Sequence, residues 1–298
     1  AHQWFGDLVT CKSWTEGWLN EGWATFMETV FKEKDLGATE TEYYRYEEFQ
    51  IYQDEDSGSY RRPIVTDFYS DPAEVWDRHT YQKAGLVLNM LRAELGDEDF
   101  WAGTKKYLER HRGGVVQTLD FQRAHEEVSG RSLDWFFDQW IYKAGYPELK
   151  ATFEWDEKTR IAGFKLAQIQ KVDDQTPLFK LNSKVEFVFA DKSSEEIEIV
   201  FKDKEKTFSQ KLKEKPLYVR FDKGNSLLKS LEWALPLEMV KAQLAKDTDV
   251  VGKVWALKHL TKDATKAGIE ALIETLKNDE FWGVRAEAAN ALGDVKTE

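Results

Sequence analysis

The spacing of apolar residues changes twice along this chain of 298 residues. In the first half of the chain, apolar residues recur at the three- to four-residue spacing that is typical of amphipathic helices. Between residues 148 and 235 they alternate with polar residues, as at Val185, Phe187 and Phe189, which is typical of strands with one buried face. Beyond residue 236 the helical spacing returns. This order of helices, strands and helices predicts a multi-domain α + β fold.

The three blocks predict three domains. Residues 1–147 are expected to be helical, and residues 148–235 are expected to form an antiparallel β-sandwich of short strands separated by turns. In residues 236–298 a weak repeat of 32 positions relates two sets of residues, Asp247, Lys253, Ala256 and Leu260 and then Asp279, Arg285, Ala288 and Leu292. The repeat predicts HEAT-like helical units. Because such arrays need about three units, this one is expected to be truncated.

Charge and composition exclude two kinds of partner. The formal net charge is −12, so we expect no nucleic-acid partner, because binding of phosphates requires a positive surface. The chain has no apolar run of about 18 residues, so we expect no membrane span within it. The one cysteine, Cys11, excludes an internal disulfide framework and does not indicate a compartment.

Two segments near the start of the chain suggest a metal site. They are AHQWFGD at residues 1–7 and WLNEGWA at residues 18–24, which place Glu21 nineteen positions after His2. A lone histidine or glutamate is more often solvated than bound to a metal. The length of the two segments changes that weighting, because together they resemble the aminopeptidase N family of zinc metallopeptidases. The site of that family reads H-E-x-x-H and then a distant glutamate in W-L-N-E-G-F-A.

The resemblance implies that His2 and Glu21 are ligands of one Zn²⁺ ion. It also implies that residues 1–147 are the C-terminal part of a thermolysin-like α-helical catalytic domain. His2 matches the second histidine of H-E-x-x-H, so the first histidine and the catalytic glutamate would precede Ala1. We therefore expect a fragment that is inactive by itself and binds zinc weakly, with the missing N-terminal part of the same protein as its partner.

The implied function of the intact protein is that of a zinc-dependent aminopeptidase, which removes N-terminal residues from peptides by metal-activated water. A second motif, YQKAG at residues 81–85, is similar to the family's Tyr-x-Lys-Gly-Ala with its last two residues transposed. The resemblance implies that Tyr81 is catalytic and donates a hydrogen bond to the oxyanion. A phenol with a pKa near 10 stays protonated at neutral pH and can take this role.

Two neighbouring features receive structural interpretations. His79 is expected to be a packed or partly exposed histidine, because no possible metal ligand stands at helical spacing from it. The acidic stretch at residues 54–58 is predicted to be a solvated turn.

The alternative function is a non-catalytic interaction scaffold of the same architecture, since a sandwich with helical repeats suits protein binding. His2, Glu21 and Tyr81 favour the enzyme, because a scaffold has no chemical need for all three. The sequence immediately before Ala1 discriminates between the two functions: His-Glu-Leu there supports catalysis.

Overall fold

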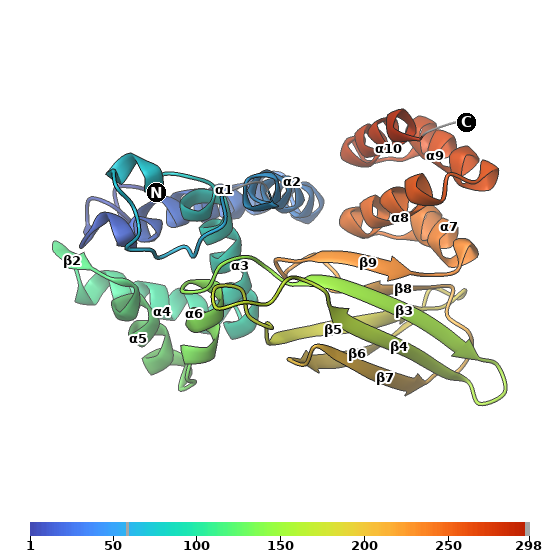
Figure 1. The fold of residues 1–298 in the computed structure, drawn as a ribbon, viewed down its shortest axis with the longest axis horizontal. Coiled ribbons are helices and arrows are strands. Elements are labelled where there is room, and N and C mark those ends of the chain that lie inside the picture. Colours follow the sequence, from blue (N-terminus) through green and yellow to red (C-terminus); the bar gives the residue numbers. More distant parts are fainter. Residues whose placement is uncertain (58–59, 296–298) are drawn as a thin grey trace. The chain divides into compact units, whose positions relative to one another are not determined.

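The structure is a computed structural model that describes residues 1–57 and 60–295. The chain divides into two compact units (Figure 1). Unit 1 contains Ala1–Pro147, Gln170–Phe179 and Ser226–Lys229. Unit 2 contains Glu148–Ile169, Lys180–Asn225 and the residues from Ser230 onward.

Unit 1 is built mainly from helices (Figure 1). Its α-helices are α1 (Trp18–Asp35), α2 (Ala38–Ser57), α3 (Ala84–Leu95), α4 (Asp97–Arg110), α5 (Thr118–Ser129) and α6 (Asp134–Trp140). Its shorter helical turns are η1 (Trp14–Glu16), η2 (Pro72–Val75) and the π-turn η3 (His79–Lys83). The short strands β1 (Val9–Cys11) and β2 (Gly114–Val116) pair in parallel.

The core of unit 1 is aromatic. Trp23 of α1 is fully buried, and its ring stacks on that of Phe5 with 3.9 Å between the centroids. Stacked aromatic rings bury large apolar areas and hold a defined relative orientation. Phe5 lies three residues after His2 and Trp23 two residues after Glu21, so this stack ties the two segments of the first motif to each other.

Helices α1 and α3 approach each other at small residues. A β-carbon added to Gly22 would lie 2.6 Å from the Ala84 β-carbon, and one added to Gly85 would lie 2.9 Å from Thr25 Cγ2. Each glycine therefore accepts a side chain of the other helix, and the order Ala84-Gly85 fits this crossing. The close approach brings Glu21, which directly precedes Gly22, towards the turn that leads into α3.

Unit 2 contains two sheets (Figure 1). The first has the order β7-β4-β3-β9 and the second the order β6-β5-β8. The strands are β3 (Glu148–Asp156), β4 (Ile161–Gln168), β5 (Leu181–Val188), β6 (Ser194–Phe201), β7 (Glu205–Lys211), β8 (Tyr218–Phe221) and β9 (Ser230–Ala234). Aromatic side chains of the two sheets meet, since the Phe164 and Phe187 ring centroids are 6.5 Å apart, as are those of Phe201 and Phe208.

One strand pairing differs from the antiparallel arrangement predicted from the sequence. Strands β3 and β9 pair in parallel, with Glu148 opposite Ser230. Each of these strands begins at the residue that follows a segment of unit 1, after Pro147 and after Lys229 respectively. The two strands lie next to each other in the order β7-β4-β3-β9, with β9 at the edge of the sheet.

Four helices complete unit 2: α7 (Leu237–Lys246), α8 (Val250–Asp263), α9 (Lys266–Asn278) and α10 (Trp282–Asp294). The repeated aspartates Asp247 and Asp279 directly follow α7 and α9. Buried Arg220 of β8 forms ion pairs with Glu186 of β5 and with Asp247, so it joins strands to helices within the unit.

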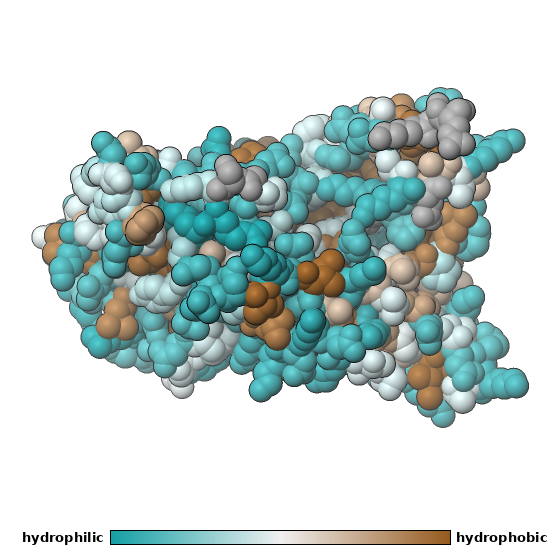
Figure 2. Space-filling model, in the orientation of Figure 1, coloured by the Kyte–Doolittle hydropathy of each residue, from teal (hydrophilic) through white to brown (hydrophobic). Residues whose placement is uncertain are grey.

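The described helices include none that combines the length and the apolar composition needed to cross a bilayer. On the face drawn in Figure 2, hydrophobic residues occur in small separate groups among hydrophilic ones. Scattered apolar residues of this kind are normal on protein surfaces and indicate no binding site by themselves.

Candidate active site

His2 and Glu21 lie side by side although they come from separate segments. His2 Nε2 is 3.3 Å from Glu21 Oε2. The His2 side chain is 55% exposed and that of Glu21 is 19% exposed, so the pair is open to solvent on the histidine side. Two ligands bonded at about 2.0–2.1 Å to one tetrahedral zinc ion would lie about 3.3 Å apart. The spacing of the two side chains thus fits a shared ion.

The second ring nitrogen of His2 supports the same conclusion. Nδ1 lies 3.3 Å from the carbonyl oxygen of Phe5. An N–H donated to this carbonyl leaves a lone pair on Nε2, facing the Glu21 carboxylate. Zinc-bound histidines characteristically donate their other ring N–H to such an oxygen. Zinc peptidase sites use three protein ligands, and His2 and Glu21 would supply two. Over residues 1–57 and 60–295, no third His, Cys, Asp or Glu side chain groups with them.

Tyr81 completes the group predicted from the sequence. It lies in the π-turn η3, which packs against α1, and its hydroxyl is close enough to the Glu21 carboxylate for the two groups to interact. Burial raises the pKa of Tyr81, and the negative charge of Glu21 and the hydrogen bond to it raise that pKa further. The phenol therefore keeps its proton at neutral pH. The structure thus brings together His2, Glu21 and Tyr81.

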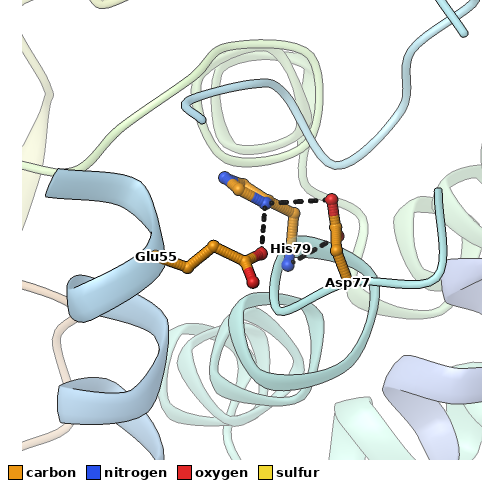
Figure 3. Close-up of side chains that lie close together, drawn as sticks. All are labelled: Glu55, Asp77 and His79. Atoms are coloured by element: carbon orange, nitrogen blue, oxygen red, sulfur yellow. Dashed lines mark hydrogen bonds and ion pairs between the residues drawn. The ribbon is translucent and has the colours of Figure 1, made fainter. Parts of the chain in front are cut away.

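A second cluster surrounds His79. Glu55, Asp77 and His79 offer ligand atoms that all lie within 4.8 Å of one another (Figure 3). His79 Nδ1 is 3.4 Å from Asp77 Oδ2 and 3.5 Å from Glu55 Oε1, while Nε2 is 3.4 Å from Asp56 Oδ1. The ring is fully buried, so the prediction of a packed histidine is correct. Its carboxylate neighbours could not be predicted from the residues around His79, because two of them, Glu55 and Asp56, come from α2.

The prediction of a solvated turn for the acidic stretch at residues 54–58 was wrong. Residues 54–57 are the last residues of α2 rather than a solvated turn, and Asp56 is only 2% exposed. Gly58, the last residue of the predicted turn, lies outside the described residues. An acidic stretch is expected to be solvated when nothing in the sequence indicates partners for its carboxylates. Here the partners of Asp56 include Arg61, at 2.7 Å, and the Tyr52 hydroxyl, at 2.9 Å.

The carboxylates around His79 already have donors. Asp77 Oδ1 is 2.6 Å from Arg62 Nη2, and Asp77 Oδ2 is 2.8 Å from Arg62 Nε. Glu55 Oε1 accepts a hydrogen bond from the backbone N–H of Arg78 at 2.9 Å. Burial by itself would raise the pKa of Asp77, but hydrogen bonds from His79 and Arg62 and the charge of Arg62 bring that pKa below its ordinary value. The charges of this cluster are therefore balanced by protein groups.

Comparisons with known proteins find similarity to peptidases. The model of the peptidase family M1 domain matches residues 1–140. Tricorn protease-interacting factor F2 of Thermoplasma volcanium is 38% identical over 160 residues, which is 50% of this chain and 20% of that protein. Probable aminopeptidase 1 of Sulfurisphaera tokodaii is 32% identical over 203 residues, 65% of this chain and 25% of that protein.

Aminopeptidase N of Streptomyces lividans is 34% identical over 175 residues, 56% of this chain and 20% of that protein. The chain thus spans a fifth to a quarter of the length of these relatives. Among solved structures, Legionella pneumophila aminopeptidase A in complex with aspartic acid matches with a TM-score of 0.78 and 19% identity. That match covers 96% of this chain and 34% of the other, and it shows a shared fold.

Proposed function

We propose that residues 1–140, which the model of the peptidase family M1 domain matches, form part of the active site of a zinc-dependent aminopeptidase. The observation that carries the proposal is the convergence of His2, Glu21 and Tyr81 from three separate segments. The names of several relatives, which are aminopeptidases, support the same reaction class.

Each of the three residues has a distinct role in this proposal. His2 Nε2 and the Glu21 carboxylate would hold the zinc ion. When bound, the ion supplies Lewis-acid polarisation of the scissile carbonyl and makes a water molecule more acidic. Tyr81 donates its hydroxyl proton in a hydrogen bond to the oxyanion that forms as the peptide bond is attacked. The raised pKa of Tyr81 supports this role, because the donor stays protonated at the pH at which most peptidases work.

We also propose a domain assignment for the three parts of the chain. Residues 1–147 would be the C-terminal part of the catalytic domain, residues 148–235 a β-sandwich, and residues 236–298 HEAT-like repeats. A third zinc ligand and a general base would come from residues that precede His2 in a longer chain. Residues 1–298 by themselves would then bind zinc weakly and turn over no peptide. The non-catalytic scaffold needs none of the three converging side chains, and their arrangement favours the enzyme.

The test uses the full-length protein that carries this chain. We expect Tyr81→Phe to lower kcat for an aminoacyl p-nitroanilide by about 100- to 1000-fold, which is the loss typical of removing one oxyanion donor. Bound zinc should stay stoichiometric in this variant. Glu21→Ala should lose the zinc itself, as measured by metal analysis after dialysis.

Tyr44→Phe is the matched control, because Tyr44 in unit 1 also donates to a glutamate, Glu28, at 2.6 Å. It should leave kcat unchanged. Wild-type turnover by Tyr81→Phe, or retention of zinc by Glu21→Ala, would show the proposed function to be wrong.

A further inference from the structure

The turn that carries Tyr81 has an unusual shape. Residues His79–Lys83 form a single π-turn, in which the Lys83 N–H reaches back five residues to the Arg78 carbonyl at 2.9 Å. Such turns are rare and short, and they occur frequently at functional sites. Contacts from outside the turn add to its own hydrogen bonds in defining where its side chains point.

One carboxylate organises the start of this turn. Asp77 Oδ1 accepts hydrogen bonds from the backbone N–H groups of His79 at 2.9 Å and Thr80 at 3.2 Å. These N–H groups belong to the first residues of the turn, where helical N–H groups lack partners within the helix. The position of Asp77 thus sets the direction in which the turn begins, two residues before Tyr81.

A buried arginine holds that carboxylate. Arg62 is 6% exposed and makes six hydrogen bonds. Two go to Asp77, and one goes from Nη2 to Thr80 Oγ1 at 3.0 Å. The other three go to the carbonyl oxygens of Pro63, Ile64 and Val75. A planar guanidinium with all these partners is held in one orientation. Through them it joins three segments: the loop before the turn, η2 and the turn itself.

The same arginine bears on whether the His79 cluster holds a metal ion. A cation that bound Asp77 would sit beside the guanidinium, whose nitrogens already lie 2.6 and 2.8 Å from the two carboxylate oxygens. Two cations that share one buried carboxylate repel each other strongly. The cluster is therefore arranged to hold the turn rather than an ion. His79 supports the turn from its other side, where it faces Glu55 and Asp56 of α2.

We propose that Arg62 is a positioning residue for Tyr81. Its guanidinium fixes Asp77 and Thr80, these fix the first residues of the π-turn, and the turn holds the Tyr81 hydroxyl at the Glu21 carboxylate. The catalytic consequence rests on the proposed function, in which the same hydroxyl donates to the oxyanion. The geometric part does not depend on it, because the contact between Tyr81 and Glu21 can be measured without turnover.

The first experiment measures that contact in residues 1–298. The protein carries ¹³Cζ-labelled tyrosine, and the Tyr81 resonance is identified by its loss in Tyr81→Phe. At one fixed pH, Glu21→Gln should shift this resonance in the otherwise wild-type chain, since it changes the acceptor. In the Arg62→Gln background the same substitution should produce no shift, because the hydroxyl no longer meets residue 21. A role in stability alone would leave the shift in place.

The control is Arg92→Gln. Arg92 of α3 also donates to two carboxylates, Glu33 and Asp97, but it makes no contact with the turn. Its replacement should leave the response of Tyr81 to Glu21→Gln unchanged. If Arg62→Gln fails to fold by circular dichroism, Thr80→Val replaces it. Thr80→Val keeps the shape of the side chain and removes the direct hydrogen bond from Arg62 to the turn, while the link through Asp77 remains, so it should reduce the shift.

The second experiment measures turnover by the full-length protein. Arg62→Gln should lower kcat by about 100-fold, the cost of misplacing a group by about 1 Å, with KM changed less than about two-fold. A folded Arg62→Gln or Thr80→Val protein with the wild-type Tyr81 response would overturn the positioning role. Loss of the Tyr81 response in a protein whose kcat is unchanged would instead overturn the catalytic role of Tyr81 and leave the positioning intact.

Discussion

Unit 1 contains two places where a histidine lies beside carboxylates. They differ in the exposure of the histidine, in the number of carboxylates near it and in the partners of those carboxylates. His2 is more than half exposed and faces one carboxylate, Glu21. His79 is fully buried and has three carboxylates within 3.5 Å. By proximity alone, the second cluster is the better candidate for an ion. Its carboxylates, however, are bound by arginines and backbone N–H groups.

The comparison separates the number of nearby ligand atoms from the number of open donor atoms, and the metal site that we propose has open donor atoms. Glu21 has the Tyr81 hydroxyl and His2 as neighbours, and neither carries a permanent positive charge. Asp77 has Arg62, which is always charged. A metal ion would therefore add a positive charge at Glu21, whereas at Asp77 it would compete with one already present.

The largest expected difference between the two places is in stability. Asp77→Ala leaves Arg62 buried without its carboxylate, and loss of one partner of a buried ion pair costs about 3–5 kcal/mol. Glu21→Ala removes a carboxylate whose neighbour His2 is more than half exposed, so its effect should stay within about 1 kcal/mol. Hydrogen exchange of the α1 and α3 amides in EDTA measures both free energies of opening. Equal losses in the two variants would remove the distinction drawn between the clusters.

A smaller effect concerns pH and Lys83, the last residue of the π-turn. Burial lowers the pKa of Lys83 from its ordinary 10.5 to about 7, although the charge of Asp56 opposes this. Between pH 7 and pH 10 the unfolded chain therefore holds a proton that the folded chain lacks. Stability should rise with pH across this window, by at most about 1.4 kcal/mol per pH unit, and be independent of this group below it.

The neighbours of Lys83 do not titrate in the same window. The pKa values of Asp56 and Asp77 are lowered by their partners, against the effect of burial, and burial raises that of Tyr52 well above 10. Lys83→Met should therefore abolish the rise, as measured by unfolding free energies at pH 7, 8 and 9. Lys105→Met on α4, where the side chain is 74% exposed, is the control and should keep it. The same pH slope in wild type and Lys83→Met would contradict the assignment.

The sequence predicts those features that repeat or that chemistry requires at a defined spacing. The change of apolar spacing after Pro147 predicted helices followed by sheets, because amphipathic periodicity is local. The motifs around His2, Glu21 and Tyr81 predicted which residues to examine, and the structure brings these residues together. Each of these predictions depends on short stretches of sequence.

The features that the sequence did not predict depend on contacts between distant segments. Arg62 lies in a loop, and nothing in its neighbourhood indicates that it will be buried against Asp77. Asp56 is expected from the sequence to be solvated, because nothing in the acidic stretch indicates its partners Arg61 and His79, which lie outside α2. The parallel pairing joins β3 and β9, which are far apart in the sequence, and no property of either strand indicates it.

The most direct test locates the metal in crystals of the zinc-loaded full-length protein, using anomalous scattering at the zinc edge. The account predicts a peak at about 2.0–2.2 Å from both His2 Nε2 and a Glu21 carboxylate oxygen. It predicts no peak among Glu55, Asp77 and His79. A zinc ion bound at His79, or its absence from His2 and Glu21, would contradict it.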